Sequence, residues 1–128
     1  MPVETIHTDY APPPAGHYAQ ACRAGDLLFV SGQLGIAPDS DPAIPVERQA
    51  ERVLDALAAI AGAAGAALHD VAKVTVYVTD IGDWPTINAI YASYFGAHRP
   101  ARAIVPVPAL HYGAKIELEA VVSLSFGP

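Results

Sequence analysis

Residues 114–126 alternate between apolar and polar side chains along almost their whole length. One series is apolar and consists of Ile116, Leu118, Ala120, Val122, Leu124 and Phe126. The intervening series contains Lys115, Glu117, Glu119, Ser123 and Ser125. A period of two is typical of a β-strand with one buried face. We therefore expect a sheet with one face covered by other elements and the other face more polar.

Two segments have the helical period instead. Residues 47–64 place apolar side chains on one stripe, made of Ala50, Val53, Leu54, Leu57, Ile60, Ala61 and Ala64. Gly62 interrupts this helix and is expected to permit close packing on the sheet. A second helix is expected after Asp83, the predicted N-cap, with Pro85 in its first turn and Gly96 at its end. Its buried stripe is predicted to be Ile87, Ile90, Tyr91, Tyr94 and Phe95.

Five further segments are predicted to be strands. They are residues 3–8, 18–23, 27–33, 71–79 and 101–107. The last of these carries Pro106, which cannot donate a ladder hydrogen bond and so favours a sheet edge or a bulge. The predicted order is β-β-β-α-β-α-β-β, an α+β fold in which both helices cover one face of a mixed sheet. The opposite face is polar but poor in charge, as is common where another subunit covers it.

Composition limits the function classes. The chain has 128 residues, which fits one domain over 1–128, and only 16% of them are charged. The net charge is −6, and the seven cationic residues are scattered rather than clustered. This distribution argues against nucleic-acid binding, which uses a concentrated basic face. A small anionic substrate stays possible, because a single arginine can hold a carboxylate.

Cysteine, histidine and hydropathy patterns narrow the choice further. Cys22 is the only cysteine, so no intrachain disulfide can form. The five histidines show no ligand spacing, and we expect no metal site. We see no leader peptide and no apolar run of membrane-spanning length, so a cytoplasmic protein without membrane contact is expected.

Arg102 lies in a segment that otherwise consists of Ala, Ile and Val. An unpaired charge in a buried strand is very costly, so this guanidinium needs a partner. Glu117 or Glu119 on the final strand could provide a structural ion pair across neighbouring strands. The partner could equally be the carboxylate of a small substrate. The residues alone leave both readings open.

Taken together, several motifs resemble the reactive intermediate deaminase family (RidA/YjgF, also known as L-PSP endoribonuclease). The matching segments are Ala-Gly-His-Tyr-Ala-Gln at 15–20, Val-Ser-Gly-Gln at 30–33, 70–78, Ile-Asn-Ala-Ile-Tyr at 87–91, Pro-Ala-Arg at 100–102 and Lys-Ile-Glu-Leu-Glu-Ala at 115–120. The resemblance implies a bacillus-type chorismate-mutase-like fold, with a mixed six-stranded sheet and two helices on one face. It also implies a homotrimer with active sites in clefts between subunits.

The resemblance further implies a hydrolytic deaminase that needs no cofactor. Such enzymes convert reactive enamines and imines, such as 2-aminoacrylate and 2-iminopropanoate, to the 2-keto acid and ammonia. By match to the family motif, Arg102 would bind the substrate carboxylate and Glu117 would position the attacking water. The implied substrate-binding residues are Tyr18, Ser31, Gly32 and Asn88, together with Ile104 at a position where relatives commonly carry cysteine.

Some positions depart from the family pattern. They are Ile104, Pro106, Pro108 and His17, which are expected around the pocket and bear on substrate identity. A specialised enzyme for a larger imine-like intermediate therefore stays an alternative, as does a non-catalytic trimer that binds small molecules. The acidic balance argues against RNA cleavage. His17 and His111 could border the cleft, and the sequence assigns neither a role.

Overall fold

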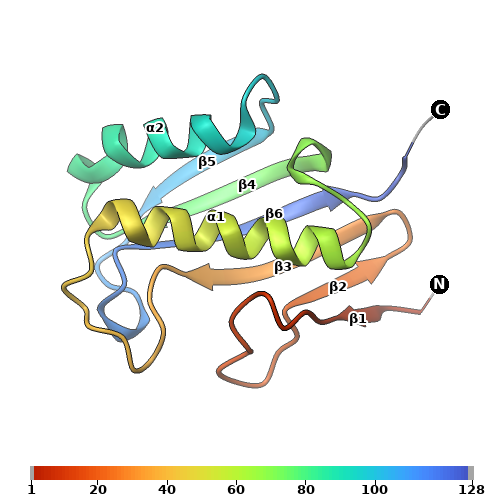
Figure 1. Ribbon diagram of the computed structural model, residues 1–128, viewed down its shortest axis with the longest axis horizontal. Coiled ribbons are helices and arrows are strands. Elements are labelled where there is room, and N and C mark those ends of the chain that lie inside the picture. The colour runs from red at the N-terminus through yellow and green to blue at the C-terminus, as the bar shows by residue number, and fades with distance from the viewer. Residues whose placement is uncertain (1, 127–128) are drawn as a thin grey trace.

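The computed structural model describes residues 2–126 and forms one mixed sheet with two α-helices (Figure 1). The elements are β1 (Glu4–Ile6), β2 (Ala21–Ala24), β3 (Leu27–Leu34), α1 (Val46–Ala63), β4 (Val71–Val78), α2 (Trp84–Phe95), β5 (Ala101–Pro106) and β6 (Ile116–Ser123). The strand order is β1-β2-β3-β6-β4-β5. Neighbours are antiparallel except β4 and β5, which are parallel. The predicted α+β fold and mixed six-stranded sheet are confirmed.

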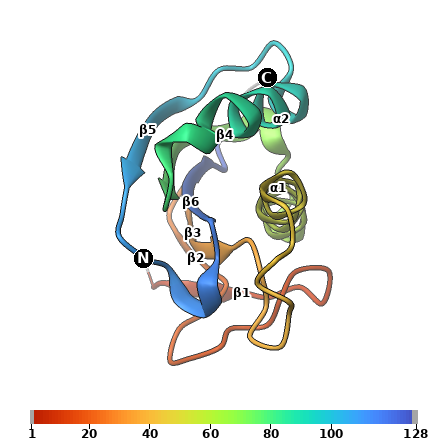
Figure 2. The ribbon, with the colours of Figure 1, turned by 90° about the vertical axis from the view of Figure 1, so that its left-hand side faces the viewer.

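Both helices lie on the same face of the sheet, as the end-on view shows (Figure 2). The apolar series of β6 is buried beneath them, with Ile116 and Leu118 each only 1% exposed. Leu54 and Leu57 of α1 and Ile87 of α2 complete this core. Because one sheet face packs against helices, the other is open in the isolated chain and carries the polar series of β6. Within residues 2–126, neither helix is long and apolar enough to cross a membrane.

The final strand is shorter than its alternation predicts. β6 ends at Ser123, which pairs with Leu27, the first residue of β3. Beyond that point β6 has no partner residues in β3, and Leu124 instead donates its backbone N–H to Asp26 O at 2.7 Å. Leu124 stays buried, but Phe126 is 57% exposed. The prediction that Phe126 joins the buried face was therefore wrong.

Three local predictions also need correction. Tyr18 lies in a loop rather than a strand, because β2 begins only at Ala21, where its pairing with β1 starts. Gly62 is exposed, and a β-carbon built there meets nothing within 4 Å, so it does not serve close packing on the sheet. Asp83 precedes α2 as expected but makes no capping hydrogen bond. Asp80 instead accepts from Gly82 N at 2.8 Å in the short 3-10 turn before the helix.

Buried glutamines hold the loops at one end of the sheet. Gln49 of α1 is fully buried and accepts from Lys115 N at 2.8 Å, while its amide donates to Ile44 O. These bonds tie the loop before α1 to the start of β6. Gln20 is 2% exposed and binds the backbone of residues 8–12 in the same way. Each amide satisfies backbone groups that would otherwise be buried without partners.

Candidate active site

A β-bulge in β3 places Ser31 and Gly32. The register with β6 pairs Val30 with Ala120 and then Gln33 with Leu118, so two residues of β3 oppose one of β6. An extra residue in one strand bends it and re-aims its side chains. Gln33 consequently turns into the covered side and is 6% exposed. Ser31 and Gly32 remain at the bulge, half-buried and free of the regular ladder.

Glu117 lies on the open face of the sheet, where it pairs with Leu34 of β3 and Tyr77 of β4. Its carboxyl group lies directly against Gly32. A β-carbon built on Gly32 would overlap Glu117 Oε2 and would also lie 3.0 Å from Glu117 Cδ. The absence of a side chain at position 32 thus makes room for the carboxylate.

Four of the predicted site residues meet in one groove of about 400 Å³. We call it the Glu117 groove, and it is lined by Ala15, Gly16, Tyr18, Ser31, Gly32, Leu34, His111, Tyr112 and Glu117. His111 and Tyr112 belong to the 3-10 turn before β6 (His111–Gly113). The groove therefore brings together the loop before β2, the bulge of β3 and the start of β6.

The hydroxyl groups in this groove have defined hydrogen bonds. Tyr18 Oη accepts from Ala15 N at 3.2 Å, which leaves the phenolic proton available to a ligand. Ser31 Oγ donates to Ala19 O at 2.6 Å, so its oxygen can still accept a hydrogen bond. The groove thus offers one donor and one acceptor near the Glu117 carboxyl group.

The pKa of Glu117 is raised above its usual value of 4.5. Partial burial is the largest cause, because it disfavours the charged carboxylate, and the nearby charge of Glu119 adds to it. His111 acts in the opposite direction and lowers the pKa. A carboxyl group with a raised pKa is better matched to proton transfer near neutral pH.

Arg102 lies at the other side of the sheet, on the edge strand β5. It pairs with Val74, whose side chain is buried under the helices, so the guanidinium faces α2. Arg102 Nη1 donates to Asn88 Oδ1 at 2.9 Å. The guanidinium carbon lies 4.7 Å from the ring centroid of Trp84 and 4.9 Å from that of Tyr91. These contacts hold the planar group in place.

A second groove of about 460 Å³ surrounds this arginine. We call it the Arg102 groove, and it is lined by Asn88, Tyr91, Ala92, Phe95, Gly96, His98, Arg99, Pro100 and Arg102. Ile104 pairs with Val76 and packs against the core, and it lines neither of the two grooves. Asn88 lies beside Arg102 as its hydrogen-bond partner.

Arg102 and Glu117 do not form the ion pair that the sequence left open. β4 lies between β5 and β6, so the two strands are not neighbours. From the register, the two α-carbons are about 14 Å apart at ordinary strand spacings. Their side chains also leave opposite faces of the sheet. Within one chain, therefore, the two catalytic candidates lie in separate grooves.

Sequence reasoning missed two features of this arrangement, the helix residues that surround Arg102 and the backbone conformation of Tyr112. Trp84, Asn88 and Tyr91 follow the i, i+4, i+7 spacing of one helix face, and this pattern could have signalled a shared partner. Tyr112 has a left-handed backbone with φ 62°. The glycine that follows it is the one local sequence signal for this conformation.

Comparisons with known proteins show the family of the chain. The family model described as Endoribonuclease L-PSP matches residues 8–124. The chain belongs to this family. Its members include the RidA proteins, and the predicted resemblance is thereby confirmed.

Several relatives of this RidA-family chain are similar over almost their full length. The RutC family protein y4sK of Sinorhizobium fredii is 50% identical and covers 96% of this chain and 99% of its own. The rat 2-iminobutanoate/2-iminopropanoate deaminase is 41% identical, with 92% and 88% covered. Among solved structures, E. coli TdcF with bound serine has a TM-score of 0.87 and 35% identity over 94% of this chain and 98% of that chain.

Proposed function

We propose that this protein is a cofactor-independent hydrolytic deaminase of reactive enamines and imines, which it converts to 2-keto acids and ammonia. The observation that carries the proposal is the Glu117 groove, where a partly buried carboxyl group lies beside Tyr18 and Ser31. Relatives named as imine deaminases, at 41% identity for the rat protein, support the same reaction. The serine bound to E. coli TdcF supports a small ligand with a carboxylate and an amine.

In this proposal, Arg102 holds the substrate carboxylate through two parallel N–H donors. Glu117 takes a proton from water while the water oxygen bonds to the imine carbon, and the C=N electron pair moves to nitrogen. Protonation of that nitrogen and loss of the proton from the new hydroxyl group then break the C–N bond, form the C=O bond of the keto acid and release ammonia. The substrate is already electrophilic, so orientation and modest electrostatic stabilisation suffice and no cofactor is assigned.

A site that combines the Arg102 groove with the Glu117 groove requires a second copy of the chain. Because Arg102 and Glu117 leave opposite faces of the sheet, we propose that Arg102 of one subunit approaches the Glu117 groove of its neighbour. The homotrimer expected for the family provides such contacts. The open sheet face also exposes Leu27 and Phe29, at 42% and 46%, and a second copy would bury them.

RNA cleavage is the activity named in the description of the family model. The chain has a net charge of −6 and only seven dispersed cationic residues. RNA binding depends on neutralising backbone phosphates with clustered cations, and this surface does not favour it.

An imine-trapping assay tests the proposed function. An amino acid oxidase generates the imino acid in situ, and semicarbazide traps whatever is not hydrolysed. We expect the wild type to lower the amount of imine that semicarbazide traps. With Arg102→Ala, this amount should equal that measured without protein. Equal trapping with and without the wild type would contradict the deaminase. If a keto acid still bound in calorimetry, the protein would instead be a non-catalytic binder.

A further inference from the structure

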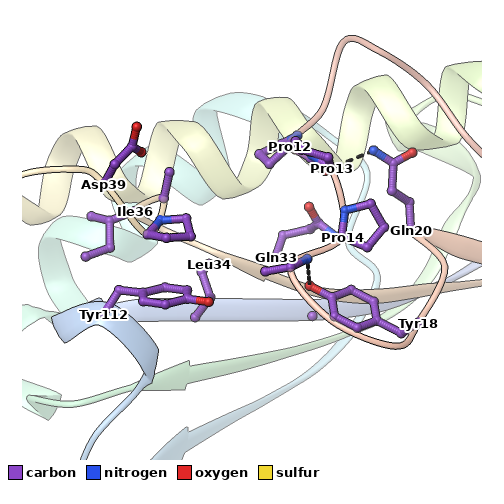
Figure 3. Close-up of a pocket in the computed structure, with 14 residues that line it drawn as sticks. Pro12, Pro13, Pro14, Tyr18, Gln20, Gln33, Leu34, Ile36, Asp39 and Tyr112 are labelled. Atoms are coloured by element: carbon purple, nitrogen blue, oxygen red, sulfur yellow. Dashed lines mark hydrogen bonds between the residues drawn. The ribbon is translucent and has the colours of Figure 1, made fainter.

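An apolar cavity, distinct from the Arg102 groove, lies beside the Glu117 groove (Figure 3). Its volume is about 310 Å³, and it lies between the loop before β2 and the segment after β3. We call it the proline pocket after Pro12, Pro13, Pro14 and Pro38, which line it together with Ile36. None of the departures predicted to shape the substrate pocket, Ile104 among them, lines it.

The proline pocket and the Glu117 groove share part of their walls. Ala15, Tyr18, Gly32, Leu34 and Tyr112 line both. Gly32 is also the residue against which the Glu117 carboxyl group lies. The apolar cavity therefore lies next to the space beside Glu117.

The walls of the proline pocket are held in place before any ligand binds. The Gln20 amide donates to the carbonyl oxygens of Thr8, Ala11 and Pro12 at 3.1, 3.4 and 2.9 Å. Its oxygen accepts from Thr8 N at 2.8 Å. One buried side chain thus fixes the backbone that leads into the proline segment, and a preformed pocket costs less ordering on binding.

Tyr112 lines both the Glu117 groove and the proline pocket. It is a non-glycine residue with φ 62° and ψ 15°, and its side chain is 41% exposed. In Figure 3 its hydroxyl end and that of Tyr18 point toward each other. A left-handed backbone at tyrosine is unfavourable, and such positions gather at ligand sites.

The pocket has the size and polarity for an aromatic or branched aliphatic group. Asp39 is the only charged residue among those that line it within residues 2–126. The volume is about twice the ~150 Å³ of an apolar protein cavity that holds benzene. A substrate side chain that carried a carboxylate would be repelled by Asp39. An apolar side chain would instead move from water to contact the prolines, which is favourable.

We propose that the proline pocket receives the large apolar side chain of a 2-imino acid and that Tyr112 sets this specificity. The inference rests on the proposed function, because it places the reacting carbon beside Glu117 and Gly32. The substrate class is then the imines of amino acids such as phenylalanine and leucine, rather than that of alanine. Burial of such a side chain corresponds to a gain of about tenfold to a hundredfold in kcat/KM.

The test compares imines derived from alanine, leucine and phenylalanine in the trapping assay with the full-length protein. The wild type is expected to prefer the phenylalanine-derived imine over the alanine-derived one by about tenfold or more. Ala37→Phe fills the pocket from its wall and should abolish this preference while alanine-imine turnover persists. Tyr112→Ala should reduce it. Ala63→Phe, an exposed position in the last turn of α1, is the matched control and should keep it.

Binding of the keto-acid products provides a readout that does not depend on a variant. Calorimetry with the wild type should show phenylpyruvate binding about tenfold or more tightly than pyruvate. Turnover of the alanine-derived imine without preference for the larger ones, together with equal binding of both products, would overturn the pocket inference and leave the deaminase intact. Failure to accelerate any imine would instead contradict the proposed function, and tighter phenylpyruvate binding would even then support the pocket.

Discussion

The carboxyl group of Glu117 occupies the space in which a side chain at position 32 would have to lie. The two residues come from neighbouring strands, and the bulge in β3 brings the Gly32 backbone under the carboxyl group. Glycine at this position therefore serves the placement of Glu117 as well as the path of the strand.

Gly32→Ala should lower imine hydrolysis strongly, by about a hundredfold, because the new methyl group displaces the Glu117 carboxyl group from its position. The glutamate side chain can move, so the fold should survive. Gly62→Ala is the control, since its β-carbon meets nothing within 4 Å at an exposed position of α1. It should keep full activity and gain about 0.5–1 kcal/mol in unfolding free energy. Denaturant unfolding and turnover measure both, and equal activity in the two variants would disprove the role of Gly32.

Asn88→Ala should raise KM about fivefold with little change in kcat. The reason is the loss of the 2.9 Å hydrogen bond that holds the Arg102 guanidinium, a bond worth about 1 kcal/mol. Trp84 and Tyr91 still flank the group, so a larger effect is not expected. Thr86→Ala, an exposed polar residue on the same helix, should leave KM unchanged. Steady-state kinetics decide the matter, and an unchanged KM in Asn88→Ala would show that Arg102 does not need this partner.

Glu117→Gln should abolish activity without loss of stability. A carboxyl group whose pKa is higher in the folded than in the unfolded state reduces stability at pH values above its folded pKa. Below the unfolded pKa both states are neutral, and the two proteins should be equally stable there. At pH 7 the variant should be as stable as the wild type to within about 0.5 kcal/mol, or more stable. Urea unfolding at pH 4 and pH 7 tests this, and a large loss at pH 7 would mean that the carboxylate is a structural partner.

The acidic limb of the profile of kcat/KM against pH should shift when the residues that change the pKa of Glu117 are replaced. His111 lowers the pKa of Glu117, so His111→Gln should move the limb to higher pH. Glu119 raises it, so Glu119→Gln should move the limb to lower pH, and by less than the histidine change because its contribution is the smaller. Profiles of kcat/KM report the free enzyme and are the right measurement. Identical limbs in the three proteins would mean that another group controls the rate.

Sequence patterns predicted the helices and strands better than they predicted which strands pair with each other. The alternation in β6 correctly placed Ile116 and Leu118 inside and Glu117 outside, because period and burial are local properties of a strand. The insertion of β4 between β5 and β6 depends on long-range pairing, which no local pattern specifies. For that reason the sequence left open an ion pair between Arg102 and Glu117 that the sheet order forbids.

In the candidate site, too, some features could be predicted from the sequence and others depend on long-range contacts. The family motif brought together Tyr18, Ser31, Gly32 and Glu117, and they do meet in one groove. The proline pocket was not foreseen, because its shape depends on how Gln20 draws the backbone of residues 8–12 across the end of the sheet. Side-chain to backbone bonds over this separation leave no periodic signal in the sequence.

Mixing two inactive variants tests the central claim most directly. Arg102→Ala and Glu117→Gln are unfolded together, refolded at equal concentration and assayed for imine hydrolysis. If each site combines Arg102 of one subunit with Glu117 of another, random assembly restores about one quarter of wild-type activity, since both residues are intact at that share of sites. Each variant refolded alone should stay inactive. Absence of recovery in a mixture shown to contain mixed oligomers would contradict the shared site.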